Sequence, residues 1–149
     1  MGTRSTIAIE LADGAVQQVY CHWDGYLSHN GKILLEHYSD PLKLQKLTSL
    51  GGISSLGREI GKKHPFSSHT SKADAIAYDA AHEAGWTTFY TRDRGEDLTV
   101  EKFKDFNDYA AFHQREEYAY CLRRVDGNAT WLVAFDHGDF TELSKELAK

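Results

Sequence analysis

The sequence predicts an α+β fold: a mainly antiparallel sheet of about five strands, built from two hairpins, with helices packed on one face. Alternating apolar strands flank turn sequences at Asp13-Gly14 and at Asp126-Gly127-Asn128, and these two patterns predict the hairpins. The segments with helical periodicity cluster between the hairpins. No repeat or linker divides the chain, so we expect a single domain over residues 1–149.

The expected order of elements is ββ-α-α-α-β-α-ββ-α. Thr6 to Leu11 alternates apolar and polar residues, and Val16 to Trp23 is its expected hairpin partner. Lys32 to Tyr38 is predicted as a short helix. A second helix begins at Asp40-Pro41, because an acidic cap followed by proline is a typical helix start, and it ends at Gly51-Gly52.

The chain from residue 51 onward is interpreted in the same way. Residues 51–72 are rich in glycine and serine and predict a long ordered loop. Ser71 to Ala84 is alanine-rich and predicts a helix, whereas Trp86 to Thr91 is aromatic and β-branched and predicts a strand. The remaining expected elements are a helix over 100–114, strands over 117–125 and 129–135, and a terminal helix over 140–148.

Composition and charge exclude several classes of partner. The net charge of −5 leaves no basic footprint, so duplex nucleic acid is not an expected partner. No apolar run approaches the roughly 20 residues of a membrane span, so no membrane is expected either. Cys21 and Cys121 each fall in a predicted strand, and we expect both to be reduced core residues of a cytoplasmic protein.

The densest group of polar and aromatic residues is the segment 20–26. In an extended strand Tyr20 and His22 share one face, and the other face carries Cys21 and Trp23, which we expect to be buried with Val19. Beyond the strand end, Asp24 orients His22 and Tyr26 adds another ring. The alternative interpretation is structural: a histidine with ordinary hydrogen bonds and an aspartate that caps a turn.

A second polar segment, residues 92–97, follows the strand predicted over 86–91. Arg92 and Arg94 alternate with Asp93, so at a strand end both guanidinium groups point the same way and form a fork for phosphate or carboxylate. The alternative is a hydrated loop in which Asp93, Glu96 and Asp97 neutralise the arginines. Further positive charge lies in the long loop, at Arg58 and over 62–64, and would join this fork if the loop folds over the sheet edge.

The sequence carries no recognisable catalytic, metal or cofactor motif. The histidines lack metal-ligand spacing, and the adjacent carboxylate pairs diverge on a strand. There is no nucleophile elbow, phosphate loop or dinucleotide fingerprint. We therefore expect no catalytic residues, no metal and no cofactor, and a ligand site formed by Tyr20, His22, Trp23, Asp24, Tyr26, Arg58, Arg92 and Arg94.

Five segments together resemble a family of small proteins with no assigned activity, encoded by bacteriophages, prophages and some bacteria. They are Thr3–Ala8, Tyr20–Tyr26, His29–Gly31, Ile53–Gly57 and Arg92–Glu96, and the resemblance spans most of the chain. The resemblance implies a genomic setting, that of phages and their bacterial hosts, and no chemistry. In the cytoplasm of such hosts, small acidic phage proteins bind host factors or sequester signalling nucleotides.

Three hypotheses about function follow. The first is a non-enzymatic phage-type accessory protein, a homo-oligomer, that binds an anionic small molecule such as a nucleotide signal to counter host defence. Here Arg92, Arg94 and Arg58 hold the anion and aromatic side chains stack on it. The second is a protein–protein inhibitor of a host defence protein or nuclease. The third is a small hydrolase or nuclease that uses His22, Asp24 and Arg92.

Overall fold

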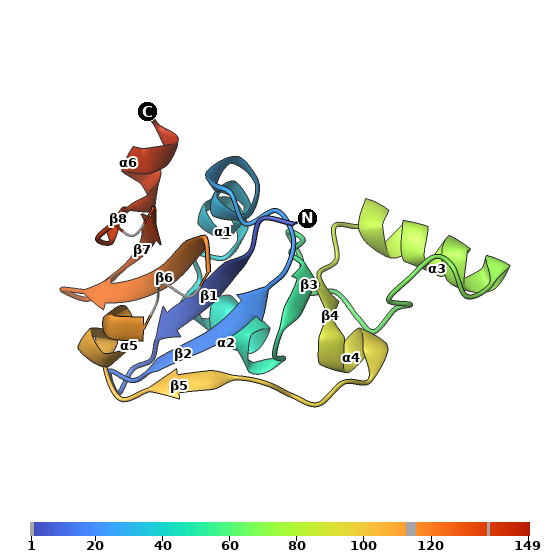
Figure 1. The fold of residues 1–149 in the computed structure, drawn as a ribbon, viewed down its shortest axis with the longest axis horizontal. Coiled ribbons are helices and arrows are strands. Elements are labelled where there is room, and N and C mark those ends of the chain that lie inside the picture. Colours follow the sequence, from blue (N-terminus) through green and yellow to red (C-terminus); the bar gives the residue numbers. More distant parts are fainter. Residues whose placement is uncertain (1, 113–115, 137) are drawn as a thin grey trace.

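The computed structural model describes residues 2–112, 116–136 and 138–149. Over these residues the chain forms a mixed eight-stranded sheet with the strand order β4-β3-β2-β1-β6-β7-β8, in which β5 also pairs with β2 (Figure 1). The expected α+β class is therefore correct in its coarse form. The expectation of about five strands built from two hairpins is wrong, because four short strands extend the sheet.

Two long antiparallel pairs form the middle of the sheet. β1 (Ser5–Glu10) pairs with β2 (Val16–Cys21), and β6 (Tyr118–Val125) pairs with β7 (Asn128–Phe135). Between β6 and β7, Asp126 and Gly127 have φ of 51° and 81°, which is the backbone of a tight primed turn. β1 and β6 lie side by side in parallel and join the two pairs into one sheet.

The four further strands have only two or three residues each. They are β3 (Ile53–Ser55), β4 (Thr88–Phe89), β5 (Glu101–Phe103) and β8 (Thr141–Glu142). β3 lies within the predicted 51–72 loop, and β5 lies where a helix was expected to begin. Segments of two or three residues show no period that a sequence pattern can reveal, because their pairing depends on the edge of the existing sheet.

The helices of the first half begin and end close to the predicted positions. α1 is Lys32–His37, α2 is Pro41–Ser49 and α3 is Lys72–Glu83, and a π-helical turn, η1 (Leu27–Gly31), precedes α1. The caps explain why they start there. The Asp40 carboxylate accepts from Leu42 N at 3.0 Å, and Ser71 Oγ accepts from Asp74 N at 3.0 Å.

The second half departs further from the prediction. The strand expected over 86–91 stops early, and α4 (Tyr90–Arg94) follows β4 directly. α5 spans Phe106–Phe112, and the expected end of that helix at 113–114 lies outside the described residues. The terminal helix α6 covers only Leu143–Leu147, because residues 141–142 pair with β7 as β8.

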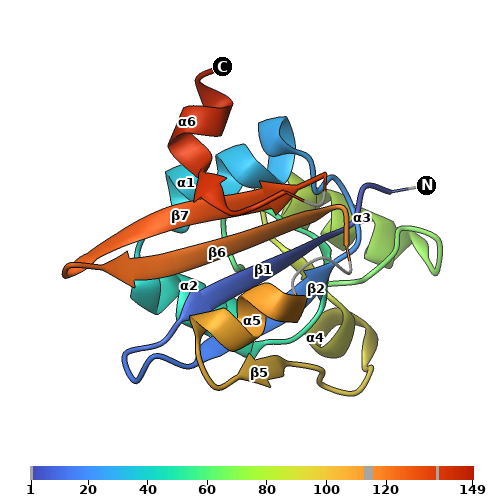
Figure 2. The ribbon, with the colours of Figure 1, turned by 60° about the vertical axis from the view of Figure 1, so that its left-hand side comes forward.

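Helices cover both faces of the sheet, which corrects the expectation of one face. Figure 2 shows α5 in front of the sheet with α1 and α2 behind it. On one face the side chains of α1, α2 and α6 pack on Ile7, Val19 and Tyr120. On the other, Tyr109 of α5 packs with Ala8, and the small side chains there leave room for its ring.

Both cysteines are free and buried, as predicted. Burial raises the pKa of the Cys21 thiol to about 12, although hydrogen bonds from Asn30 and others oppose this. Burial also raises the pKa of Cys121. Among the described segments, none of the helices has the length and hydropathy needed to cross a bilayer.

The chain between β3 and α3 is tied to the segment before β4. Thr87 Oγ1 donates to Glu59 O at 3.0 Å and accepts from Gly57 N at 3.0 Å. Gly57 approaches Gly85 so closely that a Cβ at position 57 would lie 2.2 Å from Gly85 O. These contacts hold the loop against β4 and α4, while α3 extends from the end of the molecule (Figure 1).

Candidate functional site

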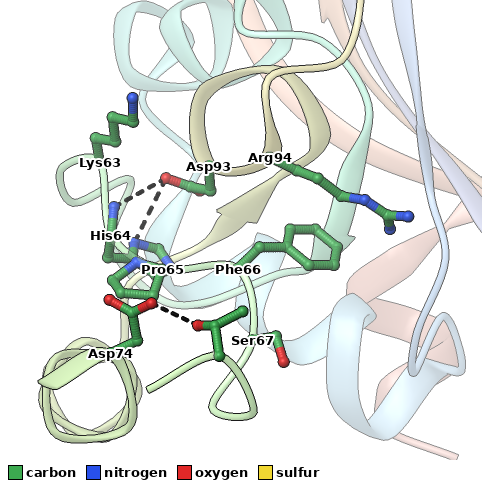
Figure 3. A pocket seen from close by; sticks show the side chains of 9 residues that line it. Lys63, His64, Pro65, Phe66, Ser67, Asp74, Asp93 and Arg94 are labelled. Carbon is green, nitrogen blue, oxygen red and sulfur yellow. Dashed lines mark hydrogen bonds and ion pairs between the residues drawn. The ribbon is translucent and has the colours of Figure 1, made fainter. Parts of the chain in front are cut away.

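The largest hollow among the pockets described for this chain lies between the 63–70 loop, the start of α3 and α4. It has a volume of about 770 Å³, and we call it the Phe66 pocket (Figure 3). Its lining residues are Lys63, His64, Pro65, Phe66, Ser67, Thr70, Asp74, Asp93 and Arg94. The pocket is open and large enough for a ligand of nucleotide size.

Asp93 supplies a fully buried carboxylate to the wall of this pocket. It accepts backbone hydrogen bonds from His64 N at 3.1 Å and from Phe89 N at 2.8 Å. Arg92 Nε donates to Asp93 Oδ1 at 3.0 Å, and the side chain of Asp93 has no exposed area. The carboxylate therefore links the loop and β4 to α4. Its negative charge is balanced by the adjacent Arg92.

His64 is almost completely buried beside Asp93. Its Nδ1 lies 2.9 Å from Lys62 O and its Nε2 lies 3.0 Å from Thr88 Oγ1. Because a carbonyl only accepts, Nδ1 carries the hydrogen and Nε2 accepts from the threonine hydroxyl in the neutral ring. Both nitrogens are thus engaged inside the protein, and Asp93 Oδ1 is 3.7 Å from Nδ1.

Arg92 is a structural residue, so its expected role in an anion fork is wrong. Its Nη1 donates to Ile60 O at 2.9 Å and to Gly61 O at 3.2 Å, and its Nη2 donates to Thr87 O at 2.8 Å. The guanidinium also lies 4.6 Å from the centre of the Phe89 ring. With its donors used on these partners and on Asp93, it has little capacity left for a ligand.

Arg94 points away from Arg92, which also corrects the predicted fork. Positions 92 and 94 lie on a helix rather than a strand end, so side chains two residues apart diverge. The Arg94 guanidinium lies 4.9 Å from the centre of the Phe66 ring and pairs with Glu96 at 3.2 Å. In Figure 3 it lies along the ring at one side of the pocket, with Lys63 at the other.

Arg58 does not line the Phe66 pocket. Its Nη2 lies 3.4 Å from Glu83 O, at the end of α3, and its side chain crosses Gly85. A Cβ at Gly85 would lie 2.6 Å from Arg58 Nη1, a contact that the flexible arginine side chain can relieve, so glycine is favoured there by its φ of 76°. The expected meeting of Arg58 with Arg94 is not seen.

The 20–26 segment has the face pattern that the sequence indicates, with one exception. Tyr20 Oη and His22 Nδ1 are 2.6 Å apart, so these two side chains do share a face. Val19 and Cys21 are buried, whereas Trp23, expected to be buried with them, is 42% exposed. Asp24 has a φ of 56° and its carbonyl accepts from Asn30 N, which is the turn geometry of the structural interpretation.

Asn30 is the organising residue of this region, and the sequence analysis did not single it out. It is completely buried, and its Nδ2 lies 3.2 Å from Trp23 O, 3.3 Å from Ser5 Oγ and 3.4 Å from Cys21 Sγ. In the sequence it stands between a histidine and a glycine, in the His29–Gly31 segment of the family resemblance. A buried asparagine is revealed by its three-dimensional surroundings, and no local pattern marks it.

The 20–26 segment and the 90–97 segment do meet, but not around the arginines. Tyr20 shares a second, smaller pocket with Tyr90, Glu96 and Asp97. Neither Trp23 nor Tyr26 lines this pocket or the Phe66 pocket. The predicted single site of cations and rings is therefore divided between separate places.

Several residues of the Phe66 pocket were not predicted as site residues. The sequence predicts Lys63 and His64 only as positive charge in a loop, and it predicts no binding role for Phe66, Ser67, Thr70 or Asp74. The available signal was the run Lys62-Lys63-His64-Pro65-Phe66, which combines cations with apolar rings.

In the described part of the chain, no group of histidine, cysteine and carboxylate side chains is placed to hold a metal ion.

Comparisons of the chain with known protein families, with curated proteins and with solved structures found no match.

Proposed function

We propose that this chain is a binding protein without catalytic activity, and that it captures an anionic small molecule with a flat ring in the Phe66 pocket. The observation that carries the proposal is the composition of the pocket. The ring of Phe66 follows Pro65 and has the Arg94 guanidinium over it, and Lys63 lies at the other end of the lining residues (Figure 3). A planar group is suited to the ring surface, and the two cations suit phosphate or carboxylate.

Hydroxyl groups add capacity for hydrogen bonds at the mouth of the pocket. Ser67 and Thr70 line it from the loop, and Thr70 Oγ1 hydrogen-bonds Asp74 Oδ2. The threonine hydroxyl is a neutral donor, so the Asp74 carboxylate keeps its charge. The Asp93 carboxylate is balanced by Arg92, which leaves Asp74 as the carboxylate of the lining that opposes the two cations.

The state of His64 and Asp93 favours binding over catalysis. A general base needs a free nitrogen or oxygen within reach of the substrate. Both nitrogens of His64 and both carboxylate oxygens of Asp93 are engaged by other protein groups. The hydrolase hypothesis also loses one of its three proposed residues, because the Arg92 guanidinium already donates to backbone carbonyls.

The proposal extends to a class of ligand, nucleotides, and to a biological setting, the host cell of a phage. A nucleotide combines a flat base with phosphate, which matches a lining that holds an aromatic ring and two cations, and the pocket volume of about 770 Å³ accommodates one. From the resemblance to phage and prophage proteins, we further propose that the protein acts as a homo-oligomer and sequesters a host signal to counter defence.

Calorimetric titration tests the proposal, with AMP, ATP and a cyclic dinucleotide as probes and adenosine as the uncharged comparison. We expect saturable binding of at least one phosphorylated probe and weaker binding of adenosine. The variant Lys63→Gln/Arg94→Gln should bind at least tenfold more weakly. The control Lys46→Gln/Lys104→Gln removes equal charge from two exposed positions elsewhere and should bind within twofold of the natural chain.

Two results would refute the Phe66 pocket as the site. One is equal loss of affinity in both double variants, which would show general charge attraction alone. The other is the absence of binding by every probe, together with no small molecule detected by mass spectrometry after denaturation of the protein purified from cells. Thermal melting of each variant establishes that it is folded before titration.

A second candidate function is supported by two exposed rings. Trp23 is 42% exposed and Tyr26 is 38% exposed, and they lie close together in the chain at the end of β2. Exposed tryptophan and tyrosine are enriched where proteins dock. If the chain is an inhibitor of a host protein, Trp23→Ala/Tyr26→Ala should abolish capture of that protein from host lysate, while Lys63→Gln/Arg94→Gln should leave it intact.

A further inference from the structure

The second pocket, which we call the Tyr20–Tyr90 pocket, lies between β2, the start of α4 and the chain leading to β5. Its volume is about 330 Å³. The lining residues are Gln18, Val19, Tyr20, Gly52, Tyr90, Thr91, Glu96, Asp97, Thr99 and Glu101. None of them lines the Phe66 pocket, but the two pockets are neighbours, because Glu96 pairs with Arg94 and the Tyr90 ring lies 5.6 Å from the Phe66 ring.

The charge of this pocket is negative. Glu96, Asp97 and Glu101 line it, and no lysine, arginine or histidine is among its described lining residues. Glu101 Oε1 accepts from Gln18 Nε2 at 3.1 Å, a neutral donor that leaves the carboxylate charge in place. Glu96 is paired with Arg94, but both side chains are about half exposed, so water screens that pair.

The walls of the pocket include two phenol rings. Desolvation raises the pKa of Tyr20 and of Tyr90, so both rings remain neutral over the physiological range. The electron-rich face of a neutral tyrosine attracts a cation. The rings also provide apolar surface for the carbon chain of an organic cation.

Gln18 provides an independent indication that a donor is missing. Its side chain is buried, with 4% of the residue exposed, and its Oε1 has no hydrogen-bond partner in the described part of the chain. Its Nε2 donates a hydrogen bond to Glu101. This bond fixes the orientation of the amide and leaves Oε1 without a donor. A buried amide oxygen without a donor is unfavourable, and a ligand N–H next to Glu101 would supply one.

From these features we propose that the Tyr20–Tyr90 pocket binds an organic ammonium ion, a protonated primary amine on a short alkyl chain. The ammonium group donates to the carboxylate of Glu101 and to Gln18 Oε1, and Asp97 adds negative charge. The alkyl chain lies against Tyr20 and Tyr90. An organic cation is favoured over a metal ion because the described carboxylates do not form a group placed to coordinate one.

Calorimetric titration with 1,4-diaminobutane and with n-butylamine, at pH 7 and low ionic strength, tests the proposal, and 1-butanol is the uncharged comparison. We expect saturable binding of an amine and none of the alcohol. Asp97→Asn/Glu101→Gln keeps the shape of both side chains and should weaken binding at least tenfold. Asp139→Asn/Glu142→Gln changes net charge equally at a distance and should bind within twofold of the natural chain.

Three results would overturn the assignment: no binding of either amine, equal binding of 1-butanol, or the same loss in both double variants. If Asp97→Asn/Glu101→Gln fails to fold, Asp97→Asn alone replaces it, because Asp97 is exposed. For this single variant, at least a threefold loss supports the site and unchanged affinity refutes it. Lys63→Gln, which changes the Phe66 pocket alone, should retain amine binding, which separates this proposal from that for the Phe66 pocket.

Discussion

Arg92 and Asp93 are adjacent in sequence, and their side chains form an ion pair with Arg92 Nε 3.0 Å from Asp93 Oδ1 beside the Phe66 pocket. Neighbouring side chains rarely meet in this way in an extended strand, where they point to opposite faces. Here the first turn of α4 brings both groups onto the 60–64 loop. The pair is the structural support of the candidate site.

Asp93→Asn should lower the free energy of unfolding by about 3 kcal/mol, because it leaves the largely buried Arg92 guanidinium without its counter-charge. Urea denaturation followed by circular dichroism measures the change. Asp139→Asn, at an exposed position, should change stability by less than about 0.5 kcal/mol. A loss at Asp93 no larger than at Asp139 would show that the buried pair does not stabilise the fold.

Arg92→Lys should lower the free energy of unfolding by about 2 kcal/mol although the charge is kept. The guanidinium reaches the carbonyls of Ile60, Gly61 and Thr87 together with Asp93, and a single ammonium group cannot. The matched control is Arg94→Lys, whose exposed pair with Glu96 is worth less than about 0.5 kcal/mol. Equal urea midpoints for the two variants would contradict the structural role of Arg92.

Asn30→Ala should lower the free energy of unfolding by about 3 kcal/mol, since it removes the amide donor from the buried Ser5 hydroxyl and leaves the Trp23 carbonyl with only the long bond from the Cys21 thiol. Gln45→Ala, on the exposed surface of α2, is the control and should be nearly neutral. The amide resonances of residues 22–30 should shift in Asn30→Ala. A neutral effect would mean that water or a rearranged neighbour replaces the amide.

Gly57→Ala should lower the free energy of unfolding by about 3 kcal/mol through overpacking. Its Cβ would lie 2.2 Å from Gly85 O, which is backbone and cannot move aside readily. Gly95→Ala provides the contrast, because the φ there is 81° but nothing lies within 4 Å, so only about 1 kcal/mol of backbone strain is expected. If Gly95→Ala is the more destabilising variant, the contact between residues 57 and 85 is looser than described.

Stability should fall as pH rises from about 9 to about 12. The Cys21 thiol has a pKa of about 12 when folded, against a model-peptide value of 9.0, because burial disfavours the thiolate. The unfolded chain therefore releases this proton first, and each such thiol contributes a slope of about 1 kcal/mol per pH unit in that range. Below pH 9 both states are protonated and the contribution is constant.

Urea midpoints measured between pH 8 and 11 test this, with Cys21→Ala/Cys121→Ala as the comparison. The double variant should show a shallower decline than the natural chain, whatever its absolute stability. Parallel slopes would exclude the thiols as a source of the alkaline loss. The same burial predicts that neither thiol reacts with Ellman's reagent until the protein is denatured.

Local patterns were enough to predict the two long hairpins, the caps at Asp40 and Ser71, and the buried thiols, because each depends on periodicity or on turn and cap chemistry within a few residues. It also indicated that Tyr20 and His22 share a face, since alternation along a strand requires it.

The short strands, the helix at 90–94 and the partners of the arginines depend on contacts between distant segments, which no local pattern reveals. Whether Arg92 faces solvent or the carbonyls of residues 60, 61 and 87 depends on where a distant loop lies. The same holds for Lys63 and Arg94, which are 31 positions apart in the sequence numbering and line one pocket. Local patterns give the direction of a side chain from its own element, but its partners are set by contacts between segments far apart in the chain.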